Sequence, residues 1–511
     1  MKPQLFKSLK NYKKKDLVSD LLAGLMVAII ALPLSIALGI QSVPESVSAN
    51  GIQFGIITAI VAGFFISALG GSKYQIGGPT AAFVVILYSY LLNPDIGLLG
   101  LALAGIMAGV LLIIMSFLKV GSVMKFFPYP ITIGFTTGIG ITLIVGQIKD
   151  LCGLDATGSE TIEKIISYFE NISTFDLYTF IVGVVGLLCV IIIPKINKKI
   201  PSAFVSLIVC TGLTFALNGL AGANVETIGS KYGDIKAGFF PIDFSGIGSV
   251  KFTALIVPSI VIAFLCAIES LLSATVAGGM TGTTFDSNQE LFGQGVANIC
   301  SSLLGGLPAT GAIARTAAGI ENGAKSPLSG MFHAIFVLIL YFALMDVVKF
   351  IPLAVFSAIL TSVAINMSRF PLFIKLLKFG VRDLLILLTT CILTVVFDLT
   401  YGVIGGVVLT FIVNAKNIKT GVKIEVADGV IKVNGTLFFV NAEKLTDAIK
   451  NQLENLDAVT IDFKNLENID QTAFEKLAVS IKKAKAQGKT VQIINANQKV
   501  NGRFNRFIAI F

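Results

Sequence analysis

The fold of this chain is decided by two short stretches, Gly77-Gly78-Pro79-Thr80-Ala81 and Gly305-Gly306-Leu307-Pro308-Ala309-Thr310-Gly311. Each places glycines and a proline before a threonine, and a short apolar segment follows. The first falls in the third, and the second in the tenth, of about fourteen apolar segments. A single Gly-Pro break is usually a helix kink. Matched breaks in two halves of a chain indicate inverted repeats with a binding site between interrupted helices.

The interrupted stretches favour a small anion as the ligand. A helix N-terminus leaves backbone N–H groups without partners and carries a partial positive charge. Two such ends that face each other can hold an anion without a Lys or Arg. We expect Pro79 and Pro308 in the first turns of their helices, where a missing N–H has no cost.

Charge divides the chain near Gly421. About a quarter of residues 421–511 are charged, as in soluble proteins, against about a ninth of the preceding residues. We therefore expect an N-terminal segment (1–16), a transmembrane domain (17–420) and a soluble domain (421–511). The Lys-rich start runs into an apolar span, and no cleavable signal peptide is expected.

The apolar segments give the expected topology. A membrane helix needs about 20 apolar residues. Eleven segments reach a usable length and three are short, and these are 17–40, 51–69, 79–92, 97–118, 129–148, 176–194, 201–220, 252–278, 289–305, 310–321, 327–346, 351–367, 383–398 and 401–415. With fourteen crossings, the clusters at Lys119 and Lys125, at Lys195, Lys198 and Lys199, and at Arg369, Lys375 and Lys378 share one side with the N-terminus. The positive-inside rule makes that side, and both termini, cytoplasmic.

A few ionisable residues lie inside these segments. Glu269 is deep in 252–278, with Ser273 one turn further on the same face. A buried acid in a span is costly without a partner, so we expect it to bind a proton or to help hold Na⁺. Arg315 falls early in the tenth segment, either as a positive charge near the anion or as a scaffold residue paired with a carboxylate. His333 and Asp398 are interpreted as structural.

Other classes of function are disfavoured. The six cysteines show no C-x-x-C spacing, which argues against disulfide and zinc frameworks. No metalloprotease, serine hydrolase or P-loop motif is present, so an enzyme is not expected. The formal charge of +9 is explained by topology, and nucleic-acid binding is not expected.

The last ninety residues alternate between strand and helix patterns. Ranges 424–426 and 430–433 flank Asp428-Gly429, a hairpin signal. Helices are predicted over 441–455 and 471–487, and strands over 458–463 and 490–494. This order indicates an α/β domain. Taken by itself, we interpret this domain as an interaction or regulatory module.

The chain resembles the sulfate permease (SulP, solute carrier 26) family. The resemblance rests on GGPTAAF at 77–83, GMTGT at 279–283 and GGLPATGAIARTA at 305–317, and the terminal domain resembles a STAS domain. It implies a polytopic all-α membrane protein with a seven-plus-seven inverted repeat, as in uracil transporters, with core and gate domains. It also implies a homodimer in the inner (plasma) membrane and transport of sulfate, bicarbonate, chloride or small carboxylates.

The resemblance also implies a site between the N-termini of the third and tenth helices. Its residues here would be Pro79, Thr80, Ala81, Gly311, Ala312, Ile313 and Ala314, with Arg315 behind, Leu34 and Leu38 from the first helix, and Glu269 and Ser273 from the eighth. A possible Na⁺ would lie at Glu269, Ser273 and Gly311. Sodium-coupled bicarbonate members have an Asp and a Thr on the eighth helix, whereas this chain has Glu269 and Ser273, which favours proton coupling.

The chain differs from proteins that it resembles at two further places. Many members have a Gln near Leu34, so the pocket here is more apolar. Anti-sigma antagonists carry Asp-Ser-Ser-Gly where this chain has Asp470-Gln471-Thr472-Ala473, so Thr472 is interpreted as structural rather than phosphorylated. A cytoplasmic protein partner of this domain is possible.

The sequence therefore predicts a secondary transporter of small anions, coupled to H⁺ or Na⁺, with bicarbonate or a carboxylate slightly ahead of sulfate. Three alternatives stay open: an uncoupled anion channel or exchanger, a nucleobase transporter of the same fold, and a membrane-anchored regulator that acts through its terminal domain.

Overall fold

The computed structural model describes residues 2–10, 12–123, 128–158, 160–197, 200–377, 380–397, 399–420, 422–427, 429–439 and 441–496. Lys125, Lys198, Lys199, Lys378, Asp398, Gly421 and Asp428, which entered the predictions, lie outside these ranges. The chain forms two compact units. One comprises Met1–Lys125 and Ile139–Met367, and the other Phe126–Gly138 and Ser368–Phe511.

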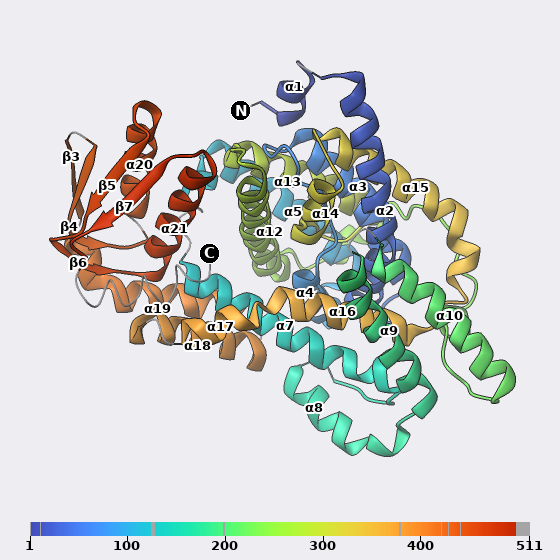
Figure 1. Cartoon of the computed structure of the whole chain (residues 1–511). Helices are drawn as coiled ribbons and strands as arrows, with labels where there is room; N and C mark the ends of the chain where they lie inside the picture. The colour runs from blue at the N-terminus through green and yellow to red at the C-terminus, as the bar shows by residue number, and fades with distance from the viewer. Residues whose placement is uncertain are drawn as a thin grey trace. The chain divides into compact units, whose positions relative to one another are not determined.

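A helix lies over each predicted apolar segment (Figure 1). In chain order these are α2 (Lys14–Ser42), α3 (Gly51–Leu69), α4 (Ala81–Leu92), α5 (Gly97–Phe117), α7 (Tyr129–Cys152), α9 (Leu177–Ile196), α10 (Ser202–Leu220), α12 (Phe252–Thr281), α13 (Ser287–Leu303), α14 (Ile313–Glu321), α15 (Leu328–Val348), α16 (Leu353–Ser368), α18 (Val381–Val396) and α19 (Leu399–Thr420).

Nine helices of the described chain are long and apolar enough to cross a membrane. The helices α4 and α14, with 12 and 9 residues, fall short of the roughly 20 that a full crossing needs. The class of polytopic all-α membrane protein is therefore confirmed, while the number of crossings stays a prediction. Short connecting helices are α1 (Gln4–Leu9), α6 (Val120–Val123), α8 (Thr161–Glu170), η2 (Ile172–Thr174), α11 (Ile228–Tyr232), η3 (Phe244–Ser249) and α17 (Phe370–Leu376).

The first unit is built around helices that pack closely. Helix α3 contacts α2, α13 and α15, and α5 contacts α12 and α13. Gly109 of α5 and Gly295 of α13 face each other so closely that a Cβ on either would lie 2.6 Å from the other's carbonyl oxygen. Small residues allow such close backbone approach in membranes, where packing rather than water exclusion drives helix association. Helices α9 and α10 pack on each other, and few of their residues are buried, as expected of lipid-facing spans.

The soluble domain in the second unit has a five-stranded sheet. Its strands are β3 (Val422–Ala427), β4 (Val430–Leu437), β5 (Ala458–Asp462), β6 (Leu466–Ile469) and β7 (Thr490–Ile494), in the order β3-β4-β5-β7 with β6 beside β4. In the described part of this sheet, β3 and β4 pair antiparallel as a hairpin with Gly429 at φ +76° in its turn, and the other strand pairs are parallel. The helices α20 (Ala442–Asn455) and α21 (Gln471–Ala486) pack on the sheet. The predicted α/β domain is thus confirmed.

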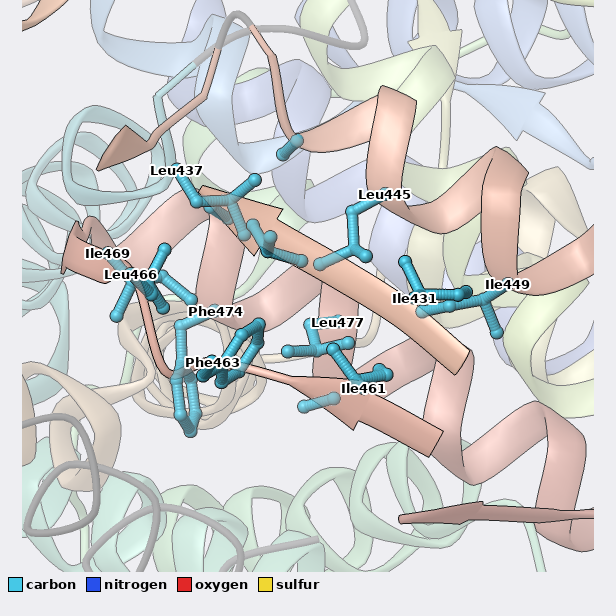
Figure 2. Packing of buried hydrophobic residues seen from close by; sticks show 14 of the residues in the cluster. Ile431, Leu437, Leu445, Ile449, Ile461, Phe463, Leu466, Ile469, Phe474 and Leu477 are labelled. Carbon is cyan, nitrogen blue, oxygen red and sulfur yellow. The ribbon is translucent and has the colours of Figure 1, made fainter. Parts of the chain in front are cut away.

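The core of this domain lies between the sheet and its two helices. Figure 2 shows Leu445 and Ile449 of α20 and Leu477 of α21 near Ile431 of β4 and Ile461 of β5. The strand β6 was not predicted, because Leu-Glu-Asn-Ile is too short to show alternation.

Candidate functional site

The two interrupted stretches lie side by side. Gly77 and Gly78 form β1, Thr310 and Gly311 form β2, and the two pair antiparallel with Gly77 opposite Gly311. The backbone N–H of Ala312 also donates to the carbonyl of Ile76 at 3.0 Å. This pairing satisfies backbone groups that would otherwise be costly inside a membrane, and it brings the starts of α4 and α14 together.

The expected position of the prolines is wrong. Pro79 lies two residues before α4, and Pro308 lies five residues before α14. The helices begin later because β1 and β2 first extend to pair with each other. A residue before proline is restricted to extended conformations, so Pro79 and Pro308 instead support the extended backbone around the pair.

Neither half-helix is capped by a side chain within the described chain. The residues that precede α4 and α14 are Thr80 and Ala312, and neither makes a capping hydrogen bond. Threonine usually caps its own helix. Here the Thr80 hydroxyl instead donates to Oε2 of Glu269 at 2.9 Å. The first backbone N–H groups of both half-helices therefore stay available for a ligand.

Helix α12 supplies the polar groups on one side of this junction. Besides Glu269, the hydroxyl of Ser273 donates to Oγ1 of Thr316 on α14 at 3.4 Å, and the Thr310 hydroxyl donates to the Cys266 carbonyl at 3.1 Å. Ser273 is fully buried, whereas Glu269 is only partly buried. The structure therefore brings Glu269 to the start of α4 and Ser273 to α14.

Arg315 supplies the polar groups on the other side of the junction between the two interrupted stretches. It lies in the first turn of α14 and is 1% exposed. Its Nη1 donates to the Gly77 carbonyl at 3.2 Å and its Nη2 to the Ser35 hydroxyl of α2 at 3.1 Å. It appears in none of the ion pairs found among the described residues, so pairing with a carboxylate is not seen there. Its charge lies directly behind β1, uncompensated by an ion pair in that part of the chain.

The remaining predicted residues differ in accessibility. Ala314 is exposed, and Thr80, Ile313 and Leu34 are partly buried. Those that are buried are Pro79, Ala81, Gly311, Ala312 and Leu38. His333, in α15, is fully buried, as expected of a packing residue. The described residues contain no cluster of three or more His, Cys, Asp or Glu side chains fit for a metal ion.

Sequence reasoning missed the residues of α13 that hold the second stretch in place. The Asn298 side chain accepts from the Ala309 N–H at 2.8 Å and donates to its carbonyl at 2.9 Å. Glu290 accepts from the Gly71 and Ser72 N–H groups, ahead of the first stretch. Glu290, Gln294 and Asn298 recur every four residues, and this polar stripe in a membrane segment was the signal that could have revealed them.

The geometry suits a small anion. Two helix starts without side-chain caps and the Arg315 guanidinium, which is in none of the ion pairs of the described residues, offer the N–H groups and the positive charge that a small anion requires, with the Glu269 carboxylate beside them.

Comparison with known proteins identifies the family of the chain. The model of the sulfate permease family matches residues 17–390, and that of the STAS domain matches residues 420–509. YvdB of Bacillus subtilis (strain 168), named for sulfate transport, is 35% identical over 494 residues, which cover 92% of this chain and 90% of that protein. The bicarbonate transporter BicA of Picosynechococcus sp. is 29% identical over 415 residues, covering 79% of this chain and 71% of BicA.

The fold is shared as well. A solved transmembrane domain of a cyanobacterial bicarbonate transporter BicA superimposes with a TM-score of 0.69 at 28% identity, covering 77% of this chain and 98% of that structure.

Proposed function

The chain belongs to the sulfate permease family, a family of transporters and not of enzymes, and from this premise we propose that it is a proton-coupled carrier of bicarbonate or another small anion. The anion would bind between the starts of α4 and α14. The names of the two relatives, one for sulfate and one for bicarbonate, support this substrate class.

The observation that carries the proposal is the engagement of Thr80 by Glu269. The Thr80 hydroxyl donates to Glu269 instead of capping α4, and among the described residues no capping side chain accepts from the first N–H groups of α4 or α14, which begin at the same junction. An anion would accept from these N–H groups and lie in the field of Arg315. Sulfate, bicarbonate and C4-dicarboxylates all have the small, oxygen-rich end that such a site fits.

Glu269 is the proposed coupling residue. An ionised Glu269 repels an anion at the start of α4, and protonation removes that repulsion. Binding of the proton and of the anion would therefore favour each other, and the coupling is reciprocal by linkage. Na⁺ at Glu269, Ser273 and the Gly311 backbone is the second candidate.

We also propose the plasma membrane as the location, cytoplasmic termini, a homodimer and a protein partner for the STAS domain. The basic clusters on one predicted side support the orientation.

Uptake into proteoliposomes tests the function. Labelled bicarbonate, sulfate, fumarate and chloride are offered with imposed proton or Na⁺ gradients to the wild type and to Glu269→Gln. We expect one anion to accumulate in the wild type only with a proton gradient. Glu269→Gln should carry the same anion without that dependence. Glu170→Gln, an exposed glutamate at the end of α8, is the matched control.

The rival functions give different results. Gradient-independent flux in both proteins would support an uncoupled channel or exchanger and would make Glu269 structural. Uptake of uracil in place of every anion would support a nucleobase transporter. The absence of any flux would favour a membrane-anchored regulator.

A further inference from the structure

A cavity of about 560 Å³ lies in the first unit, away from the junction of the two stretches. It is lined by the end of α2, one face of α4, the second half of α7, the helix α8 and the end of α11. The helices α8 and α11 lie in the connecting stretches 149–175 and 221–251, and the predicted fourteen-crossing topology places both stretches on the side opposite the cytoplasm.

The cavity follows α4 away from the candidate site. Its lining residues on that helix are Val84, Val85, Tyr88 and Leu92, which share one helical face. With a rise of 1.5 Å per residue, Val84 lies about 6 Å and Tyr88 about 12 Å along the axis from Thr80. The cavity thus begins about one turn beyond the start of α4.

Most acidic groups of the cavity already have partners. Glu45 forms an ion pair with Lys231 at 3.2 Å, and Asp150 accepts from the Gln41 amide at 2.9 Å. Burial disfavours the charge of Lys231, but Asp150, Glu45 and Glu226 outweigh it and raise its pKa. The carboxylates around Lys231 therefore favour its charged form.

Lys164 is in the opposite situation. Its ammonium lies 5.3 Å from the centre of the Tyr88 ring, on α4, and it is in none of the ion pairs found among the described residues. Burial lowers the pKa of Lys164, and Lys149 adds to this effect, although Asp150 and Glu163 act in the other direction. The nearby carboxylates thus leave this cation under-compensated, unlike Lys231.

We propose that this cavity is a second binding site for a small oxyanion or carboxylate, with Lys164 as its cationic ligand over Tyr88, which holds the substrate before it moves along α4. This rests on the proposed function, since the ligand is the transported anion. The bound anion would supply the negative charge that the surrounding carboxylates do not, and Asp150 and Glu163 would limit its affinity so that it can leave.

Transport measured from each side of the membrane tests the site. Influx of the transported anion is followed in right-side-out vesicles and in inside-out vesicles, for the wild type, Lys164→Gln, Lys164→Arg and Lys236→Gln. Lys236 is an exposed lysine in the 221–251 loop, outside the cavity lining, and serves as the matched charge control.

We expect Lys164→Gln to raise KM about tenfold in right-side-out vesicles only, with an unchanged maximal rate, because a charged hydrogen-bond partner is lost. Lys164→Arg and Lys236→Gln should keep the wild-type KM. An equal rise of KM in Lys236→Gln, or a KM of Lys164→Gln that matches the wild type, overturns the proposal of a second site and leaves the proposed function standing. A wild type that moves no anion overturns the proposed function together with this site.

Discussion

Gly78 is the residue on which the junction of the two stretches depends most directly. Its φ of +148° is a conformation that other L-residues rarely adopt, and a Cβ there would lie 1.8 Å from Nη1 of Arg315. The missing side chain lets the guanidinium reach the Gly77 carbonyl. One hydrogen atom in place of a methyl group thus allows the positive charge to lie against β1.

Gly78→Ala should therefore disrupt the site. We expect a loss of about 2–4 kcal/mol in stability from backbone strain and overpacking, together with loss of anion uptake. A thermal scan with a thiol-reactive dye, which reports exposure of the buried cysteines, measures the stability. Gly279→Ala in α12 is the control, because a Cβ there meets no atom within 4 Å. That variant should be neutral or more stable by about 0.5–1 kcal/mol. Equal melting temperatures for both variants would contradict this account.

At the scale of the element, α13 acts as the support of the second stretch. Asn298 binds the N–H and the carbonyl of Ala309 in the second stretch, Glu290 accepts from the N–H groups of Gly71 and Ser72 ahead of the first stretch, and Gln294 donates to Glu290. Cys266 of α12 also contacts the same place, since its thiol donates to the Ala309 carbonyl at 3.2 Å.

Asn298→Leu should loosen this support. The variant leaves the buried N–H and carbonyl of Ala309 without the amide, at a cost of about 1–3 kcal/mol for each group that finds no other partner. We expect faster modification of Cys266 by a small thiol reagent, and weaker anion uptake. Asn50→Leu is the control, because Asn50 precedes α3 without a capping side-chain hydrogen bond. Unchanged Cys266 reactivity in Asn298→Leu would show that α13 does not hold the stretch.

The sequence predicted elements better than contacts between them. Long apolar runs mark α2, α3 or α12 without further information, because hydropathy alone decides whether a segment can enter a membrane. The matched Gly-Pro breaks predicted where the two helices are interrupted. The partner of Thr80 could not be predicted, because the carboxylate of Glu269 lies 189 residues away and competes with local capping. The same holds for the prolines, whose placement depends on the pairing of β1 with β2.

At the scale of the whole molecule, the second unit joins the STAS domain to the start of α7. The Tyr129 N–H donates to the Thr472 hydroxyl at 2.8 Å, and Ile133 shares a buried cluster with the core of the domain. Thr472 is buried there, which fits its structural interpretation. Asp470 directly precedes α21 and accepts from the Ala473 N–H at 2.8 Å.

Glu475 makes this unit sensitive to pH. Burial raises the pKa of Glu475 to about 7, although Tyr129 and Arg369 act to lower it. The folded state therefore binds more protons than the unfolded chain between about pH 4.5 and 7. The stability that Glu475 contributes is complete below that range and is lost as the pH rises through about 7. The expected loss is about 1–3 kcal/mol.

The melting temperature of the second unit, followed by labelling of the buried Cys391 in a variant without the other cysteines, measures this loss. We expect it to fall between pH 5 and 8 in the parent protein and to stay nearly level in Glu475→Gln. Glu467→Gln is the control, because Glu467 lies in β6 and not in α21, the helix that carries Glu475. A similar slope in Glu475→Gln would show that another group is responsible.

The pairing of Gly77 with Gly311 also sets an order of events during biosynthesis. Its two partners are 234 residues apart, so the ribosome must work for about 10–50 s after making the first before the second exists. Throughout that interval the backbone around Gly77 has no strand to bond, and hydrocarbon offers it none. The backbone around Gly77 must therefore be kept out of hydrocarbon until the residues that pair with it have been made.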